Sequence, residues 1–159
     1  KTMIKIFFIN LFLIFFLTKS FLYSIEPPKT LIIIDLKKSE STLEVEINDN
    51  LSVHYDGWLF DKNIDTKNYC DAKGKKFDSS IEKPFRPEPT LFNFKIGKGL
   101  VIPGWELGLL KMKKDSKRCL VIPYQLAYGH RKIADVIPAY SNLIFEIKLV
   151  DIYKSEKND

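Results

Sequence analysis

The side chains in this sequence that could perform chemistry are aromatic rather than nucleophilic. The chain has no GxSxG, no Walker A motif and no GxGxxG that opens a helix after a strand. Its two cysteines and two histidines contain no CxxC or HxxxH pair, so we expect no metal site and no cofactor. Aromatic residues stand instead beside turns and loop ends, where they could line a concave apolar site: Tyr55, Phe77, Phe92, Phe94, Trp105, Tyr128 and Phe145.

Each of these residues also has a plainer explanation. Trp105 and the phenylalanines fit the interior of any small domain, since large apolar side chains are usually core. Asp78, before two serines, could simply form a turn, and Tyr128 with Gly129 could begin an ordinary loop. Pattern alone does not choose between a pocket and a core.

Five stretches, taken together and in this order, resemble the FKBP-type peptidyl-prolyl cis-trans isomerases. The resemblance covers roughly residues 43 to 153. The stretches are VHYDGWL (53–59), KFDSS (76–80), FKIGKGLVIPGWELGL (94–109), CLVIPYQLAYG (119–129) and VIPAYSNLIFEIKLVDI (136–152).

The resemblance implies an α+β fold, in which a bent antiparallel five-stranded sheet wraps around one short helix and leaves a proline-sized pocket between them. By motif position it implies four catalytic residues, Tyr55, Asp78, Trp105 and Tyr128. It further implies six substrate-binding residues, Phe77, Phe92, Val101, Ile102, Ile137 and Phe145, with Phe85 as a competitor for the place of Phe92. The implied partners are proline-containing polypeptides and macrolides of the FK506/rapamycin type.

These residue types suit the reaction on physical grounds. A peptide bond rotates over a barrier of about 18–20 kcal/mol because rotation breaks amide resonance. The twisted amide has lost charge separation, so a dry aromatic pocket favours it over the planar amide in water. Trp105 would be the pocket floor. The resemblance further implies that the Ile102 N–H and the Tyr128 hydroxyl donate to ligand carbonyls. The alternative is a non-catalytic module that uses the same pocket to hold Pro-containing segments, as a chaperone does.

The elements expected to position these residues are mostly strands. Only one helix is predicted, because Trp105, Leu109 and Met112 follow a helical spacing after Pro103-Gly104. Glu106 would lie in its first turn, and three lysines near its end would suit the helix dipole. Residues 61–76 are predicted as an inserted loop, and Leu43, Val45 and Ile47 as one face of a strand. Strands are expected over 30–36, 42–47, 51–60, 77–80, 91–96, 117–122 and 142–152.

The formal charge of +5, from 25 basic and 20 acidic residues, does not indicate a nucleic-acid partner. Residues 1–24 contain three lysines and no acid, so removing them leaves 22 basic and 20 acidic residues, or +2. A basic start, an apolar stretch over 6–17 and a polar end predict a signal peptide. We expect a secretory location, in the ER lumen, outside the cell or in a bacterial periplasm. A retained membrane anchor is the alternative.

The remaining chain divides into a linker with an N-terminal strand (25–42), the isomerase domain (43–153) and a charged tail (154–159). Between Tyr55 and Phe77 the chain is about twelve residues longer than the compact family pattern, and the added residues include Cys70. Cys119 alternates with Leu120 and Ile122, so it points away from the core face. Cys70 and Cys119 could pair as a disulfide that tethers the inserted loop, or remain two free thiols.

Overall fold

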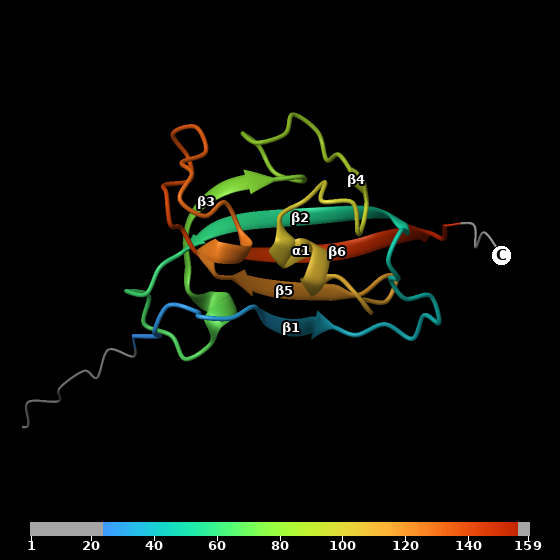
Figure 1. The fold of residues 1–159 in the computed structure, drawn as a ribbon, viewed down its shortest axis with the longest axis horizontal. Helices are drawn as coiled ribbons and strands as arrows, with labels where there is room; N and C mark the ends of the chain where they lie inside the picture. The colour runs from blue at the N-terminus through green and yellow to red at the C-terminus, as the bar shows by residue number, and fades with distance from the viewer. Residues whose placement is uncertain (1–23, 156–159) are drawn as a thin grey trace, which may run out of the picture.

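The structure is a computed structural model that describes residues 24–155. Within them, six strands form one antiparallel sheet, accompanied by one α-helix and two short 3-10 helices (Figure 1). The predicted signal segment, apart from Ser24, and most of the charged tail lie outside the described residues. The strands are β1 (Ile32–Lys37), β2 (Asn50–Phe60), β3 (Lys73–Ser79), β4 (Phe92–Lys95), β5 (Lys117–Ile122) and β6 (Leu143–Tyr153). The helices are η1 (Tyr69–Asp71), α1 (Pro103–Gly108) and η2 (Tyr124–Leu126).

The sheet has the order β1-β5-β6-β2-β3, and β4 pairs with β2 off this path. The long strand β2 pairs with two strands one after the other: its first residues pair with β4, and residues 56–60 pair with β3. The predicted α+β class with one short helix is confirmed. The sheet also takes in β1 from the predicted N-terminal segment, which pairs with β5 at the edge.

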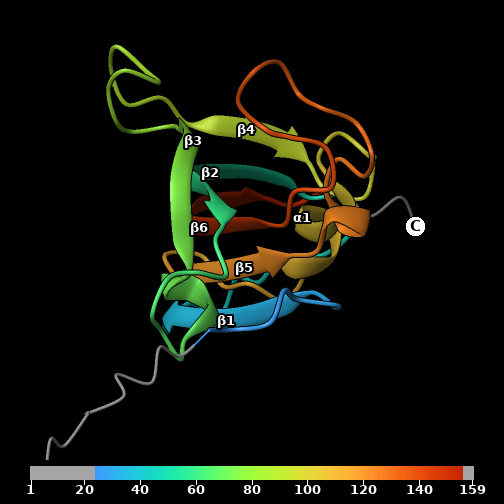
Figure 2. The same ribbon diagram turned by 90° about the vertical axis from the view of Figure 1, so that its left-hand side faces the viewer.

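Helix α1 lies against one face of the sheet, over the middle strands (Figures 1 and 2). Two glycines, one helical turn apart, allow this close approach. A Cβ on Gly104 would lie 2.5 Å from Ile122, and one on Gly108 would lie 2.7 Å from Leu120. The GWELG sequence therefore brings the helix backbone down onto β5, and this sets the height of Trp105 above the sheet.

The two faces of the sheet bury separate apolar clusters, because strand side chains alternate between faces. On the α1 face lies the main core, which includes Leu120, Ile122 and Phe145. On the opposite face lies a small cluster of five buried residues: Cys70, Ala72, Cys119, Val121 and Ile144. Cys70 and Cys119 are joined by a disulfide, one of the two alternatives that the sequence left open.

The strand predicted over 42–47 is wrong. Only Glu44 forms an isolated bridge, with Lys113, and Leu43 and Ile47 are exposed while Val45 is fully buried. The reason is the partner segment. The N–H of Val45 donates to the carbonyl of Met112, and the carbonyl of Val45 accepts from the N–H of Lys111, and both partners lie in an irregular loop. An irregular partner cannot continue a regular ladder.

Helix α1 is also shorter than predicted. It ends at Gly108, and Lys111 and Lys113 lie beyond it, with Lys111 at a φ of 61°. No basic residue lies in its last turn, so the expected dipole pairing is absent from α1. Leu109 and Met112 are buried all the same. The helical spacing predicted the burial of Leu109 and Met112 correctly, although the turn that follows α1, rather than the helix, directs these two side chains inward.

The predicted inserted loop 61–76 is irregular only in its first part, and its last residues form regular secondary structure. It contains η1, and β3 already begins at Lys73. The first residues of β3 show no apolar alternation because lysines occupy them. The amino groups of Lys73 and Lys76 lie 4.6 and 4.9 Å from the centre of the Trp58 ring, so these side chains cover an aromatic surface without being apolar.

Candidate active site

A cavity of about 500 Å³ opens on the α1 face of the sheet. Its walls come from β2, β3, β4, β6, α1 and the two loops that precede α1 and follow η2. Segments far apart in the chain therefore meet around it. The lining residues are Tyr55, Phe77, Asp78, Phe92, Gly99, Leu100, Val101, Ile102, Pro103, Trp105, Ala127, Tyr128, Arg131 and Phe145.

Trp105 on α1 is the residue about which the aromatic walls assemble. Its ring centre lies 5.2 Å from Phe145 and 5.4 Å from Tyr55, both nearly perpendicular to it. Phe92 is also edge-to-face with Trp105, at 6.0 Å, whereas the core residue Phe94 packs against it at 5.8 Å with a tilted ring. Edge-to-face packing of this kind adds stabilisation beyond area burial and holds the rings in fixed orientations. The floor of the cavity is therefore rigid and apolar.

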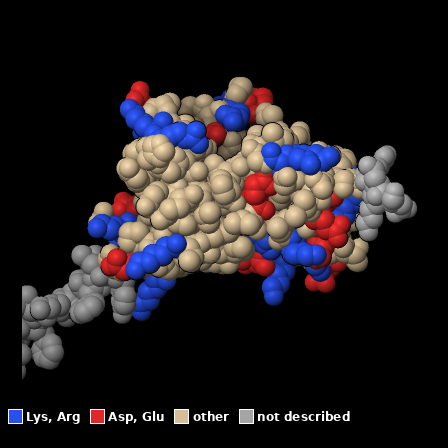
Figure 3. Space-filling view, in the orientation of Figure 1, with Lys and Arg blue, Asp and Glu red and all other residues tan. Residues whose placement is uncertain are grey.

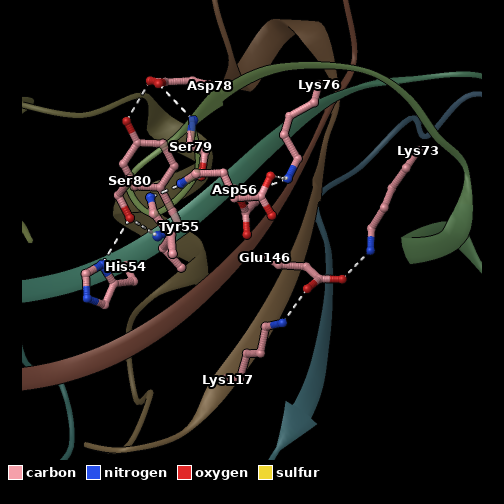
Figure 4. A network of polar contacts seen from close by, with 12 residues as sticks. His54, Tyr55, Asp56, Lys73, Lys76, Asp78, Ser79, Ser80, Lys117 and Glu146 are labelled. Atoms are coloured by element: carbon pink, nitrogen blue, oxygen red, sulfur yellow. Dashed lines mark hydrogen bonds and ion pairs between the residues drawn. The ribbon is translucent and has the colours of Figure 1, made fainter. Parts of the chain in front are cut away.

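Asp78 is held at the cavity by three groups. Its Oδ2 accepts from the Tyr55 hydroxyl at 2.6 Å and its Oδ1 accepts from the Ser79 N–H at 2.9 Å (Figure 4). Arg86 Nη1 lies 3.4 Å from the same Oδ1. Burial, together with the hydrogen bond to Asp78, raises the pKa of Tyr55 well above its ordinary value. The hydroxyl of Tyr55 therefore stays protonated and keeps the carboxylate in one orientation.

Several hydrogen-bond donors at the cavity have no partner among residues 24–155. Among them are the N–H of Ile102, just before α1, and the hydroxyl of Tyr128. Burial and the nearby Asp78 charge raise the pKa of Tyr128, so its hydroxyl remains a donor at neutral pH. A bound carbonyl oxygen could satisfy either group.

The loop that presents Ile102 is anchored by Glu106. Its carboxylate accepts from the N–H groups of Gly97 and Gly99, the latter at 2.8 Å. Both glycines have positive φ, 83° and 65°, which is a conformation that residues with a Cβ rarely adopt. The first-turn glutamate that the sequence suggested for the helix dipole thus also shapes the rim of the cavity.

Nine of the ten site residues expected from the sequence line this cavity. The exception is Ile137, which is not among the lining residues although it is as buried as Trp105 and Phe145. Its backbone pairs with Ile133. Phe92 lines the cavity and Phe85 does not. Phe94 is core, as expected.

Sequence reasoning missed Arg86, which reaches Asp78 from the proline-rich connection, and five lining residues: Gly99, Leu100, Pro103, Ala127 and Arg131. Three of these five lie inside the GKGLVIPGW stretch and Ala127 inside CLVIPYQLAYG, so the motifs already contained them. Arg86 and Arg131 had no such signal, because charged loop residues are ordinarily solvated.

The described residues offer an apolar cavity with oriented donors rather than a reactive group. Within residues 24–155, no three histidine, cysteine or carboxylate side chains gather as a metal site would require. No helix of the described chain is long and apolar enough to cross a membrane. Such a cavity can bind an apolar ring and orient the carbonyls beside it.

Comparison with known proteins shows the family of the chain. The model of the family described as FKBP-type peptidyl-prolyl cis-trans isomerase matches residues 41–150. The chain belongs to this family. FK506-binding protein 1A of Neurospora crassa is 42% identical over 123 residues, which cover 77% of this chain and 88% of the relative. FK506-binding protein 2 of Dictyostelium discoideum is 38% identical, with 75% and 77% covered.

A third relative, FK506-binding protein 2B of Rhizopus delemar, is 40% identical over 139 residues, which cover 85% of this chain and 59% of the relative. As an FKBP-type enzyme, the protein is a peptidyl-prolyl cis-trans isomerase that acts in protein folding. The family binds proline-containing peptides. The predicted family, activity and fold are therefore confirmed.

Proposed function

We propose that the cavity isomerises X-Pro bonds by holding the proline ring over Trp105 while the Ile102 N–H and the Tyr128 hydroxyl bind the flanking carbonyls. The observation that carries this assignment is the pairing of a rigid aromatic floor with two unpartnered donors in one cavity. Trp105 is 4% exposed, and its Nε1–H is a buried donor without an acceptor among the described residues. A tryptophan that served the core alone would have no reason to retain that cost.

The chemistry requires no proton transfer. A twisted amide is less polar than a planar one, so it loses less on entering an apolar cavity, and this difference lowers the barrier. Uncatalysed X-Pro bonds take tens to hundreds of seconds to rotate. Asp78, oriented by Tyr55 and Arg86, provides the one carboxylate of the wall, beside the amide that turns. Because both tyrosines have raised pKa values, we expect their ionisation to cause no loss of rate from neutral pH to about pH 9.

The experiment is an isomerisation assay on an X-Pro peptide with a set of matched variants. Phe92→Ala removes a lining ring and should lower kcat/KM at least tenfold, which corresponds to about 1.4 kcal/mol. Phe85→Ala removes a ring outside the cavity and should leave kcat/KM within about twofold. Trp105→Ala and Asp78→Ala test the floor and the carboxylate. Tyr128→Phe deletes only a hydroxyl, keeps the ring and should lower kcat/KM several-fold.

Equal losses for Phe92→Ala and Phe85→Ala would refute this assignment of the cavity. If the wild-type protein does not accelerate the reaction at all, only binding of Pro-containing segments is left. Inhibition by FK506 in the same assay tests macrolide binding at the same place. That proposal is supported by the relatives named FK506-binding proteins. Phe92→Ala should then weaken inhibition together with catalysis.

We also propose that the protein works in the secretory pathway or an equivalent oxidising space. Two features support this: the signal-like residues 1–24, and the Cys70–Cys119 disulfide, a bond that reducing cytosol does not maintain. N-terminal sequencing of the native protein should find a start near residue 21 or 25. A start within the first few residues would indicate a retained anchor, and two free thiols by mass would argue against an oxidising location.

A further inference from the structure

A second cavity, of about 180 Å³, lies away from the active site. It is formed where β1 ends and where the loop between α1 and β5 folds back beside it. We call it the basic pocket. Its lining residues are Asp35, Lys37, Lys38, Ser39, Lys111, Lys113, Ser116 and Arg118. None of them lines the active-site cavity.

The basic pocket carries a surplus of positive charge, since five of its lining side chains are cationic and one is a carboxylate. Asp35 is occupied by Arg118 Nε at 2.7 Å, and Lys111 is paired with Glu44 at 3.0 Å. Lys37, Lys38 and Lys113 form no ion pair within the described chain. Figure 3 shows blue side chains gathered at the lower edge, beneath the end of β1, with acidic ones beside them.

Arg118 gives the basic pocket a fixed, buried member. It is 9% exposed, and its Nη1 donates to the carbonyls of Gly108 at 2.8 Å and Leu110 at 3.1 Å. Its Nη2 has no hydrogen-bond acceptor among the described residues. A guanidinium held in place loses little entropy when it binds an oxyanion, and its fork suits phosphate oxygens.

We propose that the basic pocket binds a tetrahedral oxyanion group, a phosphate either free in solution or esterified to a client polypeptide. Three unpaired lysines beside a buried arginine repel one another, and a dianion would offset that repulsion. The serine hydroxyls of Ser39 and Ser116 lie in the same lining and can donate to oxygen. The volume accommodates one such group, whereas an aromatic or proline ring would find little apolar surface there.

The test is titration calorimetry and thermal unfolding of the protein with inorganic phosphate, against chloride at equal ionic strength. Phosphate should raise Tm and give a saturable isotherm, because a ligand of the folded state alone stabilises it. The triple variant Lys37→Ala/Lys38→Ala/Lys113→Ala should weaken binding at least tenfold. The control Lys62→Ala/Lys75→Ala/Lys148→Ala removes the same charge from exposed positions outside the basic pocket and should bind as the wild type does.

Equal phosphate binding by the two triple variants, or no difference between phosphate and chloride, overturns the proposal. A phosphoserine peptide separates the two sources. If the peptide binds more tightly than inorganic phosphate, the ligand is a phosphate esterified to a client polypeptide. If the two bind equally, the ligand is free phosphate. Both triple variants should retain wild-type kcat/KM on an unphosphorylated peptide, because none of these lysines lines the active-site cavity.

A separate observation concerns Arg131 at the active-site cavity. It is exposed, lines the cavity, and forms no hydrogen bond or ion pair from its side chain within the described chain. The other charged lining residue, Asp78, is already paired with Arg86. We infer that Arg131 makes the enzyme prefer peptides with a carboxylate side chain next to the proline. This inference rests on the proposed function of the cavity.

Peptides with Glu, Ala or Lys beside the proline test it at low salt. The wild type should favour Glu over Lys about two- to fivefold in kcat/KM, since exposed charge pairs contribute little more. Arg131→Glu should reverse the order, and added NaCl should reduce it. Lys132→Ala, whose lysine pairs with Asp135 and does not line the cavity, is the control. An Arg131→Glu variant with an unchanged Glu-to-Lys ratio refutes the inference. A wild-type protein that does not accelerate isomerisation of the Ala peptide would refute the proposed function instead.

Discussion

The two faces of the sheet bury apolar residues in different ways. The α1 face holds large aromatic rings around an open cavity, and there the Ile102 N–H, the Tyr128 hydroxyl and the Trp105 Nε1–H lack partners among the described residues. The apolar cluster on the opposite face is small, and its residues are almost completely buried. Its five buried residues include the two cysteines of the disulfide, and Glu146 on β6 forms ion pairs with both Lys73 and Lys117 (Figure 4).

The difference indicates that the α1 face serves ligand binding and the opposite face serves folding stability. Polar groups left unpaired in a cavity cost folding free energy and become favourable only when a ligand pairs with them. Polar groups that are already paired, as around Glu146, have nothing left to offer a ligand. We therefore expect changes on the opposite face to alter the free energy of unfolding without altering catalysis, and changes on the α1 face to alter catalysis.

The largest expected effect is loss of the disulfide. Cys70 and Cys119 are 49 residues apart, and closing a loop of that length is worth about 4 kcal/mol in the chain-entropy model. The double variant Cys70→Ala/Cys119→Ala should lose about that much in denaturant unfolding while keeping kcat/KM for the folded fraction. A large fall in kcat/KM at full folding would show that the two faces are coupled.

Gly57→Ala should come next and should affect both properties. A Cβ at this position would lie 2.8 Å from the Phe77 ring and 2.9 Å from the Phe145 ring. Overpacking of this kind costs about 1–3 kcal/mol. Because both rings line the cavity, kcat/KM should fall as well. Chemical denaturation and the peptide assay on one preparation measure the two effects, and wild-type kcat/KM in the variant would contradict the expectation.

Tyr55→Phe should have a smaller effect, confined mainly to activity. The change removes the hydrogen bond to Asp78 Oδ2 but keeps the ring that packs on Trp105. One hydrogen bond to a charged group is worth about 1.5–3 kcal/mol in full, and water reaching Asp78 replaces part of it. We expect kcat/KM to fall several-fold and the midpoint of unfolding to move little. The reverse pattern would make Tyr55 a structural residue only.

The smallest expected effect belongs to Glu146. Burial alone would raise the pKa of its carboxyl, but hydrogen bonds from Lys117 and Lys73 outweigh burial and hold the pKa below its ordinary value. A lowered folded-state pKa means that the stabilisation is present above the unfolded value of about 4.5 and is lost as pH falls through the folded value. Glu146→Gln should cost about 1 kcal/mol or less at pH 7 and less than that at pH 3.

Urea unfolding at the two pH values measures this difference. An equal loss at pH 7 and pH 3 would show that the ion pairs do not contribute. The peptide assay is the matching readout for the comparison of faces, because Glu146→Gln should leave kcat/KM unchanged.

The sequence predicted most of the strands because runs of apolar, β-branched and aromatic residues between turn residues are local properties of the chain. The prediction over 117–122 coincides with β5, and that over 142–152 differs from β6 by one residue at each end. Residues 42–47 show the limit. Their alternation resembles a strand, yet Val45 bonds to the loop at Met112, and no local pattern reports which distant segment supplies a partner.

The sequence by itself determined the family, the class of reaction and the residue types of the cavity, because five ordered motifs contain nearly all of its lining. Only the tertiary structure decided that Arg86 reaches Asp78 and that Cys70 meets Cys119. The physical reason is the same in each case. Side-chain chemistry and periodicity are local properties of the sequence. These contacts instead join residues that are far apart in the chain and meet only when the strands and loops are packed together.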